Sequence, residues 1–153
     1  MALNNLNNLY REVILDHGHH PRHNRKLANP THQMELLNPT CGDAITVQIQ
    51  VDNNQITDIA FTGHGCTIST ASASMMTETL INQTIDQAQK LIQTFNTLIT
   101  TGEISPPEAD DLLQDAALLA GLKQFPSRYK CGILAWKAVE LGLSPTESQT
   151  NTL

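Results

Sequence analysis

Apolar and polar residues alternate along residues 44–51, AITVQIQV, with the period of a β-strand that buries one face. Residues 52–55, DNNQ, follow as a hairpin turn, because asparagine tolerates the positive φ that such turns require. Residues 56–61 are then predicted to return as a second strand. Ile56 is out of phase with the apolar positions that follow it, which places it at a bulge or outside the regular ladder. A shorter strand is predicted before these two, at residues 34–37.

Apolar residues spaced three and four apart predict helices on both sides of these strands. Thr84 and Gln87 form a capping box at the start of one helix, and Gly102 is expected to end it. A second capping box begins at Ser105. The first helix after the strands is rich in small side chains, which allow close packing on a sheet. The predicted helices cover residues 4–17, 67–81, 84–102, a segment from 105, and 131–142.

This order of one helix, three strands and then only helices is typical of an α+β fold. We expect a three-stranded antiparallel sheet with helices packed on one face. The length of 153 residues suits one domain, spanning residues 1–153, with a polar and irregular tail from about residue 144. Residues 16–30, which are rich in histidine and basic side chains, are predicted to form a loop.

The charge and hydropathy of the chain exclude several classes of partner. Nine basic and 15 acidic residues leave a net charge of −6 and a pI near 5.4. This balance argues against a nucleic-acid surface and against binding to anionic membranes. No apolar run approaches the roughly 18 residues of a membrane span. The first residues lack the basic and apolar regions of a signal peptide, so a cytoplasmic protein is expected.

Three cysteines, Cys41, Cys66 and Cys131, lie at the ends of predicted elements. Their odd number and wide spacing do not fit a secreted disulfide framework, so packed thiols, nucleophiles and metal ligands all remain open. Cys66 and Cys131 begin helices, where the partial positive charge favours the thiolate. Together with Asp43, the three thiolates would supply the four ligands of a tetrahedral zinc ion, although the chain has no C-x-x-C pair.

Three segments carry a resemblance to a known family: NPTCGD at residues 38–43, GHGCTISTASASMM at 63–76 and RYKCGILAW at 128–136. They resemble iron–sulfur cluster assembly proteins related to the N-terminal domain of NifU, and the similarity covers nearly the whole chain. Within that family the SufU-type branch is most similar. The stretch between the second and third cysteines is longer than in IscU-type scaffolds, and Lys130 stands where scaffolds carry a histidine. The Leu-Pro-Pro-Val-Lys segment of the scaffolds is also missing.

The resemblance implies a SufU/IscU-like fold and a zinc-dependent sulfurtransferase. Such proteins accept persulfide sulfur from a pyridoxal-phosphate cysteine desulfurase of the SufS type and work with downstream iron–sulfur assembly components. The position of Cys41 is the sulfur acceptor in that family, and a histidine of the desulfurase replaces it on zinc. The implied zinc ligands are Cys41, Asp43, Cys66 and Cys131.

The residues themselves agree with that assignment. Cys41 is predicted on a turn beside Gly42, so it can leave a metal more easily than a ligand at the start of a helix. Three thiolates and one carboxylate around Zn²⁺ carry excess negative charge. Arg128 and Lys130 are predicted to offset this charge and to steady a leaving thiolate, which gives them a catalytic role. The alternative is that they form a solvated basic patch.

Two other functions use the same ligands. In the first, they hold a transient [2Fe–2S] cluster and the protein is a scaffold of the IscU type. In the second, the zinc is purely structural and the protein only docks on a partner. The histidines between residues 17 and 23 are expected to be solvated, whereas His64 is placed to contact a metal ligand. Met75 and Met76 are expected in the core.

Overall fold

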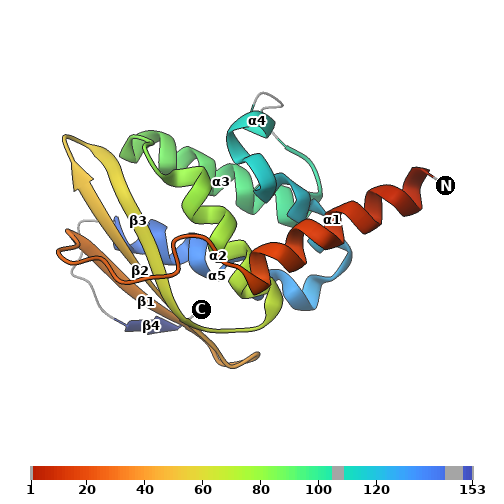
Figure 1. The fold of residues 1–153 in the computed structure, drawn as a ribbon, viewed down its shortest axis with the longest axis horizontal. Coiled ribbons are helices and arrows are strands. Elements are labelled where there is room, and N and C mark those ends of the chain that lie inside the picture. Colours follow the sequence, from red (N-terminus) through yellow and green to blue (C-terminus); the bar gives the residue numbers. More distant parts are fainter. Residues whose placement is uncertain (1, 105–108, 144–149, 153) are drawn as a thin grey trace.

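The computed structural model describes residues 2–104, 109–143 and 150–152, and it describes side chains within 11–104 and 109–143. Its centre is an antiparallel sheet with helices on one face, which confirms the predicted α+β class (Figure 1). The antiparallel strands are β1 (His32–Asn38), β2 (Asp43–Asp52) and β3 (Gln55–His64).

A fourth short strand, β4 (Thr150–Thr152), runs parallel to β1 at the edge of the sheet. The strand order is β3-β2-β1-β4. The expectation of an irregular tail is therefore wrong for these three residues. Their sequence, Thr-Asn-Thr, has no alternation that would identify a strand, and it is the open edge of β1 that supplies the partner for the backbone.

The hairpin between β2 and β3 forms as predicted. Asn53 and Asn54 have φ values of 51° and 63°, the left-handed conformation that a two-residue hairpin turn requires. The pairing register shifts between Gln50 and Val51, so that Val51 lies opposite Ile56. This irregularity accounts for the phase of Ile56 in the sequence and confirms the predicted bulge.

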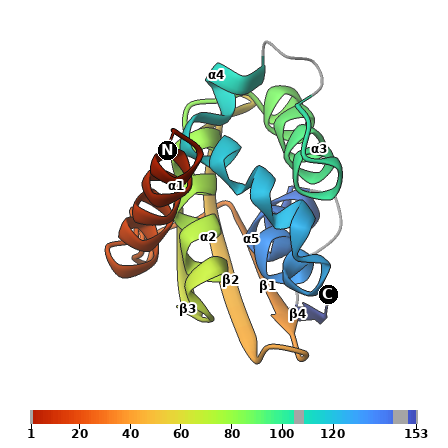
Figure 2. The same cartoon turned by 90° about the vertical axis from the view of Figure 1, so that its right-hand side faces the viewer.

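Two layers of helical segments cover one face of the sheet (Figure 2). These segments are α1 (Ala2–His19), α2 (Thr67–Leu80), α3 (Ile85–Thr101), α4 (Ala109–Leu113), the 3₁₀ segments η1 (Gln114–Gln124) and η2 (Pro126–Arg128), and α5 (Tyr129–Gly142). α5 packs on β1 and β2, and α2 packs on β3. α1 lies along α2, while α3 and η1 contact each other in the outer layer. Within the described residues, no helix is long and apolar enough to cross a membrane.

The caps of α3 are those that the sequence predicts. The Thr84 hydroxyl accepts the N–H of Gln87 at 3.1 Å, and Gly102 ends the helix with φ 81°. The predicted helix start at Ser105 lies outside the described residues. The following described segment is a short α-helix that continues as the 3₁₀ segment η1, rather than as one regular helix.

The N-terminal helix is longer than the pattern predicts. α1 continues to His19, so residues 16–19 are helical and the loop begins later. His17 is only 1% exposed, and the expectation that it is solvated is wrong. Its imidazole is buried because both ring nitrogens find hydrogen-bond partners on other elements. His19 and His20 are exposed, as expected.

The core lies between the sheet and the helices that cover it. Trp136 and Phe95 stack with ring centroids 4.0 Å apart, and the Trp136 indole N–H donates to Ser72 Oγ at 2.9 Å. Met75 and Met76 are fully buried, as predicted. α5 begins at Tyr129, two residues earlier than expected, so Cys131 lies in its first turn.

Candidate metal centre

Cys41, Asp43 and Cys131 converge although they come from three parts of the chain. Cys41 lies in the turn between β1 and β2, Asp43 is the first residue of β2, and Cys131 lies in the first turn of α5. One ligand atom from each of these side chains lies within 4.8 Å of the others. The Sγ atoms of Cys41 and Cys131 are 3.4 Å apart. The structure therefore brings together three of the four predicted zinc ligands.

The turn that carries Cys41 is shaped by two local features. The Cys41 N–H donates to the carbonyl oxygen of Asn38 at 3.3 Å, which closes the turn. Gly42 has φ 73°, a conformation that other residues rarely adopt. Cys41 is exposed as a result, whereas Cys131 is fully buried.

Two glycines bring the end of β3 close to Asp43. Gly63 has φ 118°, and a Cβ atom there would lie 2.0 Å from the carbonyl oxygen of Ala44. A Cβ atom on Gly65 would lie 2.9 Å from Asp43 Oδ1 and 2.9 Å from the Ser69 Cβ. Both positions exclude a side chain, so the loop between β3 and α2 can close over the carboxylate.

The Asp43 carboxylate is 2% exposed and accepts three hydrogen bonds. The Cys66 backbone N–H donates to Oδ1 at 3.0 Å. The Ser69 hydroxyl donates to Oδ2 at 2.8 Å, and the Asn38 side-chain amide donates to the same oxygen at 3.2 Å. These donors hold the carboxylate in one orientation and compensate for its burial.

Cys66, the fourth predicted ligand, caps the N-terminus of α2. Its Sγ accepts the Ser69 N–H at 3.4 Å and lies 3.5 Å from Ser69 Oγ. Cys66 is not one of the three side chains whose ligand atoms all lie within 4.8 Å, but its N–H contacts Asp43 and its thiol interacts with that of Cys131. The structure therefore places Cys66 at the border of the cluster.

The thiols differ in acidity. Burial opposes ionisation of Cys66, but the hydrogen bonds from Ser69 outweigh it and lower the pKa of the Cys66 thiol below its ordinary value. Burial, together with hydrogen bonds to Cys41 and Cys66, raises the pKa of Cys131 to about 12. Burial therefore favours the protonated thiol of Cys131, and a bound cation would reverse this preference because it favours the thiolate.

The donor set fits zinc. Soft thiolates and one carboxylate, converging from a turn, a strand and the start of a helix, are ligand types that Zn²⁺ takes in tetrahedral protein sites. The contacts of Asp43 with Asn38 and Ser69 also match the outer hydrogen bonds that orient metal-binding carboxylates.

The predicted basic residues differ in their relation to the thiols. Arg128 precedes α5, and its hydrogen bond with Cys131, followed by the charges of the three cysteines, raises the pKa of the guanidinium. Lys130 is exposed in the first turn of α5, and no described hydrogen bond or ion pair joins it to the thiols. His64 is exposed at the end of β3, opposite Ala44. Contact of His64 with a metal ligand stays a prediction.

Asn38 and Ser69 are the two site residues that sequence reasoning missed. Ser69 lies three residues after Cys66, which caps α2. The side chain of a cap residue usually accepts a hydrogen bond from the N–H at this position, so a local signal existed for Ser69. Asn38 lies in the NPTCGD segment, but its contact with Asp43 depends on the pairing of β1 with β2.

A second group of ligand-type side chains lies elsewhere, where α1, α2 and η1 meet. His17 Nε2 is 2.9 Å from Asp115 Oδ2 and 3.8 Å from Glu78 Oε1. Its Nδ1 is 2.8 Å from Ser74 Oγ, which also accepts the Arg22 backbone N–H at 2.8 Å. The histidine is buried and the two carboxylates reach solvent.

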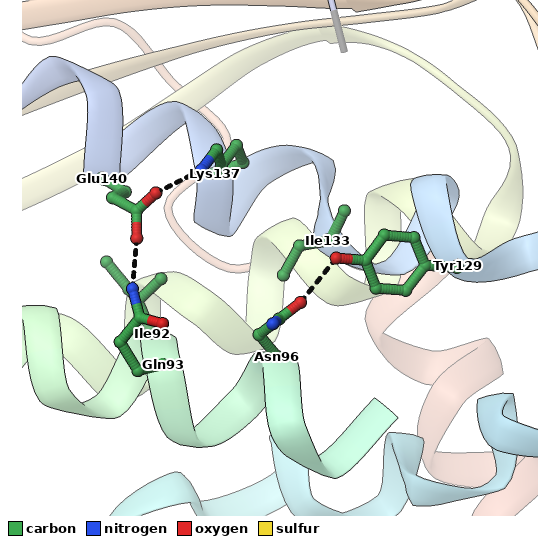
Figure 3. A pocket seen from close by; sticks show the side chains of 7 residues that line it. All are labelled: Ile92, Gln93, Asn96, Tyr129, Ile133, Lys137 and Glu140. Atoms are coloured by element: carbon green, nitrogen blue, oxygen red, sulfur yellow. Dashed lines mark hydrogen bonds and ion pairs between the residues drawn. The ribbon is translucent and has the colours of Figure 1, made fainter. Parts of the chain in front are cut away.

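A pocket of about 160 Å³ lies between α3 and α5 (Figure 3). Its polar side chains already bond to one another: Tyr129 to Asn96, and Glu140 to both Lys137 and Gln93. None of the cysteines lines it. The lining residues are Ile92, Gln93, Asn96, Tyr129, Ile133, Lys137 and Glu140.

The fold and the convergence of Cys41 and Cys131 on the buried Asp43, with Cys66 at the border, lead to a known class of protein. The profile of the NifU-like N-terminal domain matches residues 9–144. The chain therefore belongs to this family.

The relatives include proteins named as scaffolds and one named as a sulfurtransferase. The iron-sulfur cluster assembly scaffold protein IscU of Streptococcus pyogenes serotype M1 is 44% identical over 140 residues, which cover 92% of this chain and 86% of the relative. The zinc-dependent sulfurtransferase SufU of Bacillus subtilis strain 168 is 39% identical over 145 residues, covering 94% and 95%. The crystal structure of SufU from Fervidobacterium islandicum AW-1, which is named as an iron-sulfur cluster assembly scaffold protein for the SUF system, superposes with a TM-score of 0.80 at 30% identity, covering 87% of this chain and 95% of that one.

Proposed function

We propose that the protein is a zinc-dependent sulfurtransferase of cytoplasmic iron–sulfur cluster assembly. It accepts persulfide sulfur on Cys41 from a pyridoxal-phosphate cysteine desulfurase of the SufS type and works with downstream assembly components. One observation carries the proposal: two thiols 3.4 Å apart differ in exposure, with Cys41 exposed and Cys131 fully buried. A donor protein can reach Cys41, while Cys131 stays in the core.

In this proposal the zinc ligands are Cys41, Asp43, Cys66 and Cys131. Bound zinc keeps its thiol ligands deprotonated at neutral pH. Cys66 and Cys131 are fixed at the starts of α2 and α5, and Asp43 is held by three donors. Cys41, on an exposed turn beside Gly42, is the ligand that the fold holds least firmly.

The transfer is an exchange between a thiolate and a persulfide. The Cys41 thiolate attacks the outer sulfur of the desulfurase persulfide, and a new sulfur–sulfur bond forms on Cys41. The sulfur–sulfur bond of the donor breaks, and the donor cysteine leaves as a thiolate with the electron pair. The exchange needs no external oxidant or reductant. Arg128, beside the thiols, stabilises the negative charge of the leaving thiolate during this step. Lys130 adds positive charge on the exposed side of the first turn of α5.

The second candidate is a scaffold that assembles a [2Fe–2S] cluster on the same ligands. The observation that favours it is the 44% identity to a relative named as a scaffold. Zinc and iron would compete for the same thiolates. A zinc-loaded sample that forms a durable [2Fe–2S] chromophore with iron and sulfide would therefore support the scaffold over the sulfurtransferase.

The deciding experiment measures turnover of a SufS-type desulfurase with wild-type protein and with Cys41→Ser. We expect the wild type to accelerate turnover and Cys41→Ser to bind the desulfurase without accelerating it. Mass spectrometry after alkylation should locate the extra sulfur on Cys41. An active Cys41→Ser variant with the sulfur first on Cys131 would contradict the proposal. A wild type that binds the desulfurase but leaves turnover unchanged would favour a purely structural zinc protein.

The same assay separates the two basic residues. Arg128→Gln should slow sulfur transfer, because it removes the charge that contacts Cys131. Lys130→Gln should have the smaller effect, because no described interaction joins the Lys130 side chain to the thiols, although both residues are exposed. Wild-type rates for both Arg128→Gln and Lys130→Gln would instead support the alternative that the two residues form a solvated basic patch.

A further inference from the structure

We propose that Ser69 is a positioning residue of the metal centre, and that its hydroxyl leaves Asp43 with one oxygen, Oδ1, to bind the metal. The inference rests on the proposed function, because it requires Asp43 to be a ligand. It adds a residue that is not itself a ligand, and it specifies how the carboxylate binds.

Ser69 contacts two proposed ligands, Cys66 and Asp43, and its hydroxyl lies nearer to Asp43 than to Cys66. Its backbone N–H donates to Cys66 Sγ at 3.4 Å, and its hydroxyl donates to Asp43 Oδ2 at 2.8 Å. Ser69 is 1% exposed, so water does not compete for either contact. A hydroxyl has one proton, and an ionised carboxylate can only accept, so the direction of the bond to Asp43 is determined. Ser69 thereby ties the start of β2 to the start of α2.

The oxygens of Asp43 differ in the number of hydrogen bonds that they accept. Oδ2 accepts from both Ser69 and Asn38, which uses its two lone pairs. Among the described contacts, Oδ1 accepts from the Cys66 N–H alone and keeps one lone pair. The count assigns a monodentate metal bond to Oδ1. Loss of the Ser69 hydroxyl would free a lone pair on Oδ2 and allow the carboxylate to rotate or to bind through both oxygens.

Asn38 gives independent support for a carboxylate that is held for function. Its amide group donates to Asp43, and its own Oδ1 is buried without a hydrogen-bond partner in the described structure. An unsatisfied buried oxygen is unfavourable for stability, and such groups are uncommon. The amide cannot turn to improve this without placing its oxygen against the carboxylate. The fold tolerates the defect to keep a donor on Asp43.

Ser72 provides a matched control for Ser69. It lies one turn further along α2, is also fully buried, and donates its hydroxyl to the carbonyl oxygen of Gly132 at 2.6 Å. Serine-to-alanine substitution removes the same buried hydroxyl at both positions. At position 72 the lost bonds, to the Gly132 carbonyl and from the Trp136 indole, are in the core, and at position 69 the lost bond is on the proposed ligand.

The test compares zinc affinity of the wild type, Ser69→Ala and Ser72→Ala by competition with a chromogenic chelator. We expect Ser69→Ala to weaken zinc binding by about 10- to 100-fold, the usual effect of removing an outer hydrogen bond to a metal ligand. Ser72→Ala should bind zinc within about 2-fold of the wild type. Cobalt(II) loaded in place of zinc should show altered ligand-field bands in Ser69→Ala and wild-type bands in Ser72→Ala, because only the former changes the carboxylate.

A double-mutant cycle shows whether Ser69 acts through Asp43. Adding Ser69→Ala to Asp43→Ala should cause no further loss of affinity, because the acceptor of the hydroxyl is already gone. Equal losses in the two backgrounds, equal losses for Ser69→Ala and Ser72→Ala, or wild-type affinity of Ser69→Ala would each overturn the inference while leaving the zinc centre in place. A wild type that binds neither zinc nor cobalt would overturn both this inference and the proposed function.

Discussion

The two clusters of metal-ligand side chains in the described structure differ in how well the protein itself satisfies them. In the histidine cluster, His17 is bonded at both ring nitrogens, to Ser74 at 2.8 Å and to Asp115 at 2.9 Å. In the cysteine cluster, Cys41 and Cys131 face each other at 3.4 Å, and a thiol is only a weak donor and acceptor. The first cluster is complete without a cation. In the second, the Asp43 carboxylate has hydrogen-bond donors, whereas Cys41 and Cys131 have only their weak mutual contact in the described structure.

The difference separates a structural polar network from the proposed metal centre. The His17 chain joins α1, α2 and η1, and it extends through Ser74 to the Arg22 backbone. A satisfied buried network of this kind fixes how helices pack. Side chains that could bind a metal are therefore not enough to indicate a site. The atoms must also lack better partners within the protein.

The largest expected effect concerns the reactivity of the thiols after zinc is removed by a chelator. Its raised pKa, of about 12, leaves Cys131 almost entirely protonated at pH 8, whereas the thiolate is the form that reacts with iodoacetamide. Cys66 has a lowered pKa, so its thiolate fraction at this pH is higher than that of an ordinary cysteine. Peptide mass spectrometry should find Cys66 alkylated while Cys131 is unmodified. Faster modification of Cys131 would contradict the acidity order.

Removal of the buried thiol should abolish the metal centre. Cys131→Ser is expected to reduce zinc from about one per chain to near zero in purified protein, measured by elemental analysis. With free zinc at 1,000 times Kd, bound zinc adds about 4 kcal/mol to the free energy of unfolding, and the variant should lose this increment. The metal-free proteins should differ much less in stability. Full zinc retention by Cys131→Ser would remove Cys131 from the ligand set.

His17→Ala tests the other cluster. The substitution leaves a small cavity and deprives Ser74 of a partner, so we expect it to lower the free energy of unfolding by about 3 kcal/mol. Zinc content should be unchanged, because His17 belongs to a separate network. Urea denaturation and elemental analysis of the same sample provide both values. Zinc loss without a loss of stability would mean that the His17 cluster, rather than being structural, contributes to metal binding.

Asp115→Asn should have the smallest effect. Asp115 is 53% exposed, and its hydrogen bond to His17 is one of two that the imidazole makes, so the expected loss is about 1 kcal/mol. Asp111→Asn, an exposed carboxylate on α4 outside the network, is the matched control and should change stability by less than about 0.5 kcal/mol. Indistinguishable unfolding midpoints for the two variants would mean that the His17–Asp115 bond does not stabilise the fold.

Local sequence signals predict the elements that depend on near neighbours. The alternation in residues 44–51, the Asn53–Asn54 turn and the Gly102 cap all form as expected, because strand period, positive φ and capping are properties of a few adjacent residues. The positions of the cysteines at element ends follow from the same local patterns. β4 was not predictable in this way, since its pairing depends on the edge of a distant strand.

Contacts between distant segments decided which of these side chains lie together and which are buried. The sequence alone determined that three thiols and one carboxylate stand at turns and helix starts, which limits the chemistry to a few classes. Only the tertiary structure placed Cys41 beside Cys131, 90 residues away, and buried Asp43 under Ser69 and Asn38. It also gave His17 partners on two other elements. Local patterns describe each segment's shape and exposed face, whereas these distances arise when the segments pack, because each hydrogen-bond partner is supplied by a different element.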